Sequence, residues 1–179
     1  TPEAVVISCF DPVRKEIAKE SLERLISDGR IHPARIEEIV QKVTREVQNK
    51  IYEEGEKALF DLGIHNMPTE GVRALGRLYF RTSYGQNVLT HSKEVATVAS
   101  MLAAEIGADR ELAKRAAILH DIGKGAETDS DQNHAEVGAE LARKMGEDPR
   151  VINAIAAHHN DVEATTLEAT LVQIADAIS

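Results

Sequence analysis

The hexapeptide Leu119-His120-Asp121-Ile122-Gly123-Lys124 places an imidazole next to a carboxylate where an apolar stretch ends. Leu112 and Ala116 precede Leu119 at helical spacing, so the stretch predicts a helix that ends at the His-Asp pair, just before the breaker Gly123. Burying an unpaired polar group costs roughly a few kcal/mol, and burying an unpaired charge costs far more. The pair therefore needs partners, and a bound cation would satisfy both side chains.

Four further segments put histidine or aspartate on an apolar helical face. The segment 88–106 is the clearest, because Val88, Val95 and Leu102 share one face with His91. The residues of this kind in all five segments are His91, His120, Asp121, His134, His158, His159 and Asp176. A single histidine on such a face is more often a hydrogen-bonded core residue than a ligand. Five segments of this kind instead predict ligands that converge on a metal.

The predicted ligand set contains imidazoles and carboxylates but no thiolate. Such ligands suit Mn, Fe, Ni or Zn and, less well, Mg, and they argue against a structural zinc site of the cysteine type. Seven ligands exceed what one ion with open positions would take. We therefore expect one or two divalent metal ions, and Asp121 would bridge two adjacent ones.

The set resembles the pattern of the HD superfamily of metal-dependent phosphohydrolases. That pattern is a histidine, a His-Asp pair and a later aspartate, here His91, His120-Asp121 and Asp176, with His134 and His158-His159 added. The resemblance implies that His91, His120, Asp121 and Asp176 bind the first ion, and that Asp121, His134, His158 and His159 bind the second. A water activated between the ions would attack a phosphodiester, so that no nucleophilic side chain is required.

Longer runs resemble the ribonuclease Y family more narrowly. These runs are Arg81–Leu89, Ile152–His159 and Val172–Ser179, and the resemblance continues upstream through Asp28–Glu38, so it covers essentially the whole chain. The family is a bacterial endoribonuclease anchored at the inner face of the cell membrane by an N-terminal segment, which is followed by a coiled coil, a KH domain and an HD domain. The resemblance implies RNA as substrate, a role in mRNA turnover and a cytoplasmic location.

On this plan the chain divides into three parts. Residues 1–30 would be the C-terminal remnant of the KH domain, with a last strand at Val5-Val6-Ile7, residues 31–66 a helical connector, and residues 67–179 an HD domain truncated at its C-terminal end. No Gly-x-x-Gly pair is present, so RNA capture by a KH loop is not expected. We therefore predict an all-α fold, an HD-domain helical bundle preceded by a long connector helix and a short strand-helix remnant.

Turn and cap residues punctuate this helical plan. Asp11-Pro12 opens a helix that Gly29 ends, and His32-Pro33 opens a much longer one. The long helix suits a connector, a homodimer contact or a return onto its own domain, and the pattern leaves these open. Further along, Gly107 and Gly146 predict helix ends, Asp148-Pro149 predicts a helix start, and Ser83-x-x-Gln86 and Thr165-x-x-Glu168 predict capping boxes.

Composition limits the partners. A chain of 179 residues that is 42% hydrophobic can form one real core, and no apolar run approaches the eighteen or so residues that span a bilayer, so we expect no membrane contact by this chain. The single Cys9 and the lack of a secretory signal at Thr1 predict an intracellular-type domain cut from a larger protein. A net charge of −9 opposes non-specific adhesion to polyanions.

Basic residues and metal ions would offset this net negative charge near the predicted site. Arg77, Arg81, Lys114, Arg115 and Lys124 flank the ligand segments, and divalent ions would reverse the local charge. Lys124 follows the His-Asp pair directly, so we expect Lys124 to act with Asp121 in catalysis by offsetting charge on the phosphate.

Two alternatives to an endoribonuclease stay open. One is an HD-type phosphohydrolase of small or cyclic nucleotides, although the Gly-Tyr-Pro motif of the cyclic-dinucleotide branch does not follow His158-His159. The other is a non-catalytic module for dimerisation or for docking RNA-degradation proteins.

Overall fold

The fold is built almost entirely from helices, as the sequence predicted. The computed structural model describes residues 4–126 and 133–179. The elements in order are α1 (Pro12–Asp28), α2 (Pro33–Asp61), α3 (Thr69–Arg77), the 3-10 helix η1 (Leu78–Phe80), β1 (Thr82–Ser83), β2 (Gln86–Asn87), α4 (Val88–Ile106), α5 (Arg110–Leu119), the 3-10 helix η2 (Ile122–Gly125), α6 (His134–Lys144), α7 (Pro149–Ala157) and α8 (Leu167–Ile178).

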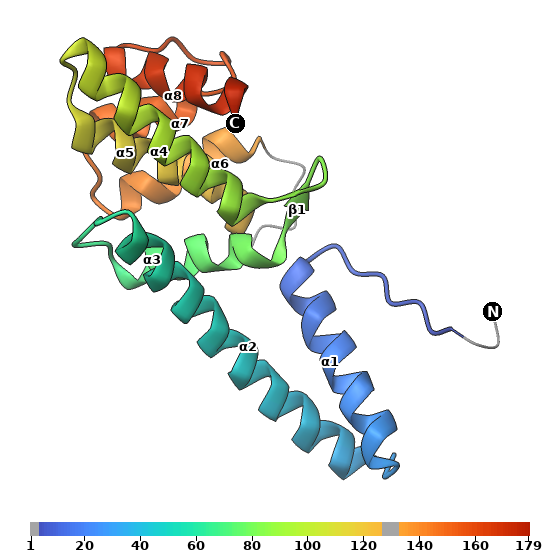
Figure 1. The fold of residues 1–179 in the computed structure, drawn as a ribbon. Coiled ribbons are helices and arrows are strands. Elements are labelled where there is room, and N and C mark those ends of the chain that lie inside the picture. Colours follow the sequence, from blue (N-terminus) through green and yellow to red (C-terminus); the bar gives the residue numbers. More distant parts are fainter. Residues whose placement is uncertain (1–3, 127–132) are drawn as a thin grey trace.

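Two apolar cores organise these helices. A small core joins α1 to the first part of α2 through Val13, Leu25, Val43 and Val47 among others, so the two helices form an antiparallel hairpin that extends from the bundle (Figure 1). A large core joins α3 to α8, and it also includes Ala58 from the end of α2. The long helix is therefore continuous with the bundle at one end and pairs with α1 at the other.

The predicted helix ends are confirmed where a cap residue marks them. Asp11 caps α1, and Gly29 ends it with a left-handed φ of 73°. His32 caps α2 by accepting a bond from the Arg35 backbone, and Asp148 caps α7. Gly107 ends α4 in the same left-handed conformation as Gly29. These residues act through their own local backbone, which explains why sequence alone identifies them.

Other local predictions were wrong. The stretch around Val5 and Val6 is not a strand, and these side chains are 72% and 86% exposed, because the described residues offer it no strand to pair with. Ser83-x-x-Gln86 is not a capping box but the β1–β2 hairpin, in which Tyr84 and Gly85 both have positive φ, and Asn87 caps α4 instead.

The second predicted capping box is displaced by one residue. Thr166, and not Thr165, caps α8 by accepting a bond from the Ala169 backbone. Glu168 does not close a box there, because its carboxylate accepts a bond from the backbone N–H of Asp109. Glu168 therefore connects the start of α8 to the start of α5, and it does not make the local cap that the sequence pattern predicted.

Asp11 has two roles at the junction of α1 and the bundle. Its carboxylate accepts bonds from the N–H groups of Val13 and Arg14, and it lies 3.0 Å from the Arg77 guanidinium. Asp11→Ala should therefore lower the free energy of unfolding by about 1–2 kcal/mol, as measured by urea denaturation. Asp11→Asn keeps a cap acceptor and loses only the charge, so it should lose less; equal losses would assign the whole effect to the ion pair.

Candidate metal centre

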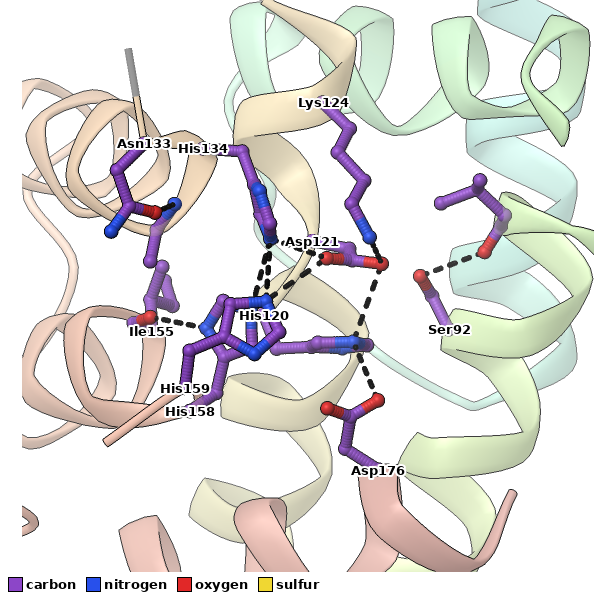
Figure 2. Close-up of polar contacts among 12 residues, drawn as sticks. Ser92, His120, Asp121, Lys124, Asn133, His134, Ile155, His158, His159 and Asp176 are labelled. Atoms are coloured by element: carbon purple, nitrogen blue, oxygen red, sulfur yellow. Dashed lines mark hydrogen bonds and ion pairs between the residues drawn. The ribbon is translucent and has the colours of Figure 1, made fainter. Parts of the chain in front are cut away.

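The ends of five helices meet at one place in the bundle. His91 lies in the first turn of α4, His120 and Asp121 follow α5, and His134 begins α6. His158 and His159 follow α7, and Asp176 lies in the last turn of α8. Figure 2 shows six of these seven side chains pointing toward one another. The structure thus brings together all seven residues that the sequence nominated, whereas His32 and His65 belong to neither metal-binding group of the described residues.

One group of possible ligands consists of His91, His120 and Asp176. Asp176 Oδ1 lies 2.9 Å from His91 Nε2 and 3.5 Å from His120 Nε2. The ligand atoms of the three residues lie within 4.8 Å of one another, close enough to share one ion. His120 is 1% exposed, so this group reaches the interior of the bundle.

A second group consists of His134, His158 and His159. His134 Nε2 lies 3.3 Å from His158 Nε2 and 2.9 Å from His159 Nε2. Three ring nitrogens therefore face a common point, and the ligand atoms again lie within 4.8 Å of one another. His158 is buried while His159 is exposed, so the second group opens toward solvent.

Asp121 lies between the two groups. Its Oδ2 is 3.5 Å from His120 Nε2, and its Oδ1 is 3.3 Å from His134 Nε2 and 3.7 Å from His158 Nε2. Each carboxylate oxygen thus faces a different group, which is the arrangement of a bridging ligand. With only 2% of its surface exposed, Asp121 has few other ways to satisfy its charge.

Backbone carbonyls orient the two buried rings. His120 Nδ1 lies 2.7 Å from the Ala117 carbonyl, and His158 Nδ1 lies 2.6 Å from the Ile155 carbonyl. A carbonyl oxygen only accepts, so each Nδ1 carries a proton, and in the neutral ring each Nε2 presents its lone pair to the centre. Metal-binding histidines in proteins are commonly held in this way.

The ionisation of the site also suits a cation. Burial opposes ionisation of Asp121, but the His134 ring, His120 and Lys124 outweigh it and hold the Asp121 pKa well below its usual range. Burial likewise opposes ionisation of Asp176, whose pKa is lowered by His120 and His91. Burial, reinforced by the charge of His120, lowers the pKa of His158 to about 3. Ionised carboxylates and a neutral imidazole are the ligating forms.

His120 differs from His158 in the direction of its pKa shift. Burial alone would lower its pKa, but Asp176 and Asp121 outweigh burial and raise the pKa of His120. Asp121 and Asp176 thus favour a second proton on His120, and the Lys124 ammonium lies beside Asp121 Oδ2. A divalent ion would replace the proton, because a ligating imidazole must be deprotonated.

Two buried polar atoms without hydrogen-bond partners also indicate that the site fits a metal ion. Within the described residues, His120 Nε2 and Asp121 Oδ1 are buried without a hydrogen-bond partner. Buried polar atoms are rarely left in this state. Both atoms face the points where the two groups converge, so the donor set, its ionisation and its unsatisfied atoms all fit bound divalent ions.

Lys124 lies at the edge of this centre. Its Nζ is 2.7 Å from Asp121 Oδ2, and its side chain is 19% exposed (Figure 2). It is placed on η2, three residues after Asp121. The ammonium is thus held next to the Asp121 carboxylate, while part of the Lys124 side chain remains accessible from solvent.

Two contacts that hold η2 were not identified from the sequence. Arg77 donates to the Gly125 carbonyl at 2.7 Å, and Arg81 donates to the Lys124 carbonyl at 2.8 Å. The sequence nominated both arginines only as charges that flank the ligand segments. Their bonds span more than forty residues, with separations of 48 and 43 along the chain, so no local pattern could reveal them.

Comparison with known proteins agrees with this geometry. A family model described as HD domain matches residues 88–179, which include all seven ligand candidates. The chain belongs to the HD domain family. This HD domain begins at the first residue of α4, so the α1–α2 hairpin and α3 lie outside the matched region.

Relatives extend the similarity beyond the HD domain. Proteins named ribonuclease Y from Treponema denticola and Treponema pallidum are 78% and 79% identical to the chain over 179 residues, and the one from Borreliella burgdorferi is 63% identical over 181 residues. All of the chain is covered in each case, but only 35–36% of each relative. The chain thus spans about a third of the length of these curated relatives, and its resemblance to the ribonuclease Y family is confirmed.

Two further findings concern solved structures and membrane-spanning helices. No solved structure matches the chain. None of the described helices is both long enough and apolar enough to cross a membrane.

Proposed function

We propose that this chain carries the catalytic centre of a metal-dependent endoribonuclease that hydrolyses single-stranded RNA in mRNA turnover. The observation that carries the proposal is the position of Asp121, with one carboxylate oxygen facing each of two ligand groups. The relatives named ribonuclease Y support RNA as substrate, and the HD domain supports hydrolysis of a phosphate ester.

The residues divide the chemical work as follows. His91, His120 and Asp176 would hold one ion, His134, His158 and His159 the other, and Asp121 both. A divalent ion held by these residues would polarise a phosphodiester oxygen and would lower the pKa of a bound water from about 16 toward 7. The carbonyls of Ala117 and Ile155 keep the His120 and His158 rings in the ligating tautomer. Lys124 offsets the negative charge that develops on the phosphate oxygens.

The metal would be Mn, Fe, Ni, Zn or Mg, in one or two ions, because the donors are nitrogen and oxygen. We also propose that the whole protein works in the cytoplasm, at the inner face of the membrane, as a homodimer that meets other RNA-degradation proteins. Ile36 and Val40 support a contact between copies, since they lie on α2 and remain more than a third exposed.

The test combines metal content with RNA cleavage. The purified chain would be analysed for bound metals by elemental mass spectrometry, and a 5′-labelled single-stranded RNA would be incubated with it, with and without Mn²⁺. Bound metal together with internal cuts would support the proposal. Bound metal without cuts, but with release of phosphate from free nucleotides, would replace it by a small-nucleotide phosphohydrolase. Absence of metal even after Mn²⁺ addition would favour a non-catalytic interaction module.

A further inference from the structure

A hollow beside the metal centre gathers cations from several elements. It has a volume of about 350 Å³ and lies between the start of α1 and the η2 segment. Its charged lining residues are Arg14, Arg77, Arg81, Lys124 and Asp11. Among the described lining residues, four cations surround one carboxylate, although the net charge of the chain is −9. Such a concentration of positive charge predicts an anionic ligand.

Two of these cations are fixed in orientation by the protein itself. Arg77 binds the Gly125 carbonyl and the Asp11 carboxylate, and Arg81 binds the Lys124 carbonyl through one terminal nitrogen. A guanidinium has five N–H donors. Within the described residues the Arg81 side chain makes no other hydrogen bond, and the exposed Arg14 side chain forms no ion pair, so both can donate to a ligand.

The hollow and the metal centre share one side chain, Lys124. The same side chain lines the hollow and approaches Asp121 Oδ2 to 2.7 Å. A polynucleotide with its reacting phosphate at the metal centre would therefore carry an adjacent phosphate toward Arg14 and Arg81. A mononucleotide has no such second phosphodiester.

An aromatic ring also lines the hollow. Phe10 is 72% exposed, although only 3% of the residues in this chain are aromatic. Proteins that bind single-stranded nucleic acids combine a positive groove that follows the backbone with exposed aromatic rings that stack on bases. Phe10 and the cations provide both parts at one place.

We propose that this hollow binds the backbone phosphate next to the scissile one in single-stranded RNA, with Arg14 and Arg81 on the phosphate and Phe10 stacked on a base. The inference rests on the proposed function, because it assigns to the same centre a polymeric substrate longer than a nucleotide. It also explains how an acidic chain captures a polyanion, since the positive charge is local.

Binding can be tested separately from cleavage. The affinity of a 5′-labelled eight-nucleotide single-stranded RNA would be measured by fluorescence anisotropy in EDTA over a range of salt concentrations. Arg14→Ala should weaken binding about fivefold and reduce the slope of log affinity against log salt by about 0.7, the value for one lost phosphate contact. Phe10→Ala should weaken binding about tenfold with little change in that slope.

Two matched variants sharpen the result. Lys15→Ala removes a positive charge from the neighbouring position on α1, outside the hollow, and should change the affinity less than about twofold. Asp11→Asn removes the one carboxylate among the described residues that line the hollow and keeps a cap acceptor, so it should tighten binding. Equal affinities for Arg14→Ala and Lys15→Ala, or wild-type affinity of Phe10→Ala, would overturn the proposal.

Hydrolysis of bis(4-nitrophenyl) phosphate with Mn²⁺ distinguishes the two proposals. This compound has one phosphodiester and cannot reach the hollow with a second phosphate. Suppose that the wild-type chain hydrolyses this compound, but that Arg14→Ala, Phe10→Ala and Lys15→Ala all bind RNA with the same affinity. The proposal for the hollow is then wrong, and the proposal for the metal centre stands. Suppose instead that the wild-type chain hydrolyses neither this compound nor RNA, but that Arg14→Ala and Phe10→Ala still weaken RNA binding. The proposal of a catalytic centre is then wrong, and the proposal that the hollow binds RNA stands.

Discussion

Asp121→Asn is expected to reduce RNA hydrolysis by about three orders of magnitude or more. Asparagine keeps the shape of the side chain but has one oxygen and no charge, so it cannot serve both ligand groups. It also removes the anion that lies close to His120, His134 and Lys124. Single-turnover cleavage of labelled RNA in Mn²⁺ would measure the loss, and elemental analysis should find less metal per chain.

The control must separate catalysis from folding. Asp28→Asn removes the same charge at the end of α1, where Asp28 pairs with Arg30 and Arg35 away from the ligand candidates, and should leave cleavage unchanged. Both variants should keep the helical circular dichroism of the wild type, because the large core does not depend on Asp121. An Asp121→Asn protein with full activity would exclude a bridging role for this carboxylate.

The convergence of the seven ligand candidates could be predicted from sequence, because they lie on apolar helical faces or at the ends of such faces. His91 and His134 are polar residues on apolar helical faces, and the His120-Asp121 pair ends such a face. Burial of that kind demands a partner, and the helix periodicity identifies the buried face without any knowledge of the tertiary structure. The grouping around Asp121 followed from the family resemblance, and the distances are consistent with it.

The features of the structure that could not be predicted from the sequence depend on contacts between distant segments. Glu168 looks like part of a capping box, but it binds the backbone of Asp109, 59 residues away. The stretch at Val5 has strand-forming residues, yet a strand exists only with a hydrogen-bonded neighbour. The hollow at Arg14 lies where Asp11 contacts Arg77, 66 residues away along the chain. Local patterns contain no information about such pairings.

Gly123, at the metal centre, also has a role that its local sequence does not reveal. The sequence suggested a helix breaker, but Gly123 lies within η2 and is not among the described glycines with positive φ. Its importance is the closeness of α6: a Cβ at Gly123 would lie 1.9 Å from the His134 carbonyl oxygen and 2.7 Å from the Gly138 nitrogen. Absence of a side chain allows η2, which follows Asp121, to pack directly against the turn that carries His134.

Gly123→Ala should therefore damage the second ligand group more than the first. Real Cβ atoms essentially never come within 3.0 Å of such an atom, so η2 and α6 would have to separate by about 1 Å or more. The free energy of unfolding should fall by about 3 kcal/mol, as measured by urea denaturation. A displacement of about 1 Å at His134 should reduce RNA cleavage about 100-fold. Elemental analysis should find one ion retained by His91, His120 and Asp176.

Gly107→Ala is the matched control, because it introduces the same methyl group where nothing lies within 4 Å. Its cost comes only from the left-handed φ of 74° and should be about 1 kcal/mol, with cleavage and metal content unchanged. Loss of both ions in Gly123→Ala, with stability no lower than in the Gly107→Ala control, would mean that the two ligand groups bind as one unit. A ratio of one ion per chain would instead show that the close approach of η2 and α6 is what assembles the second group around Asp121.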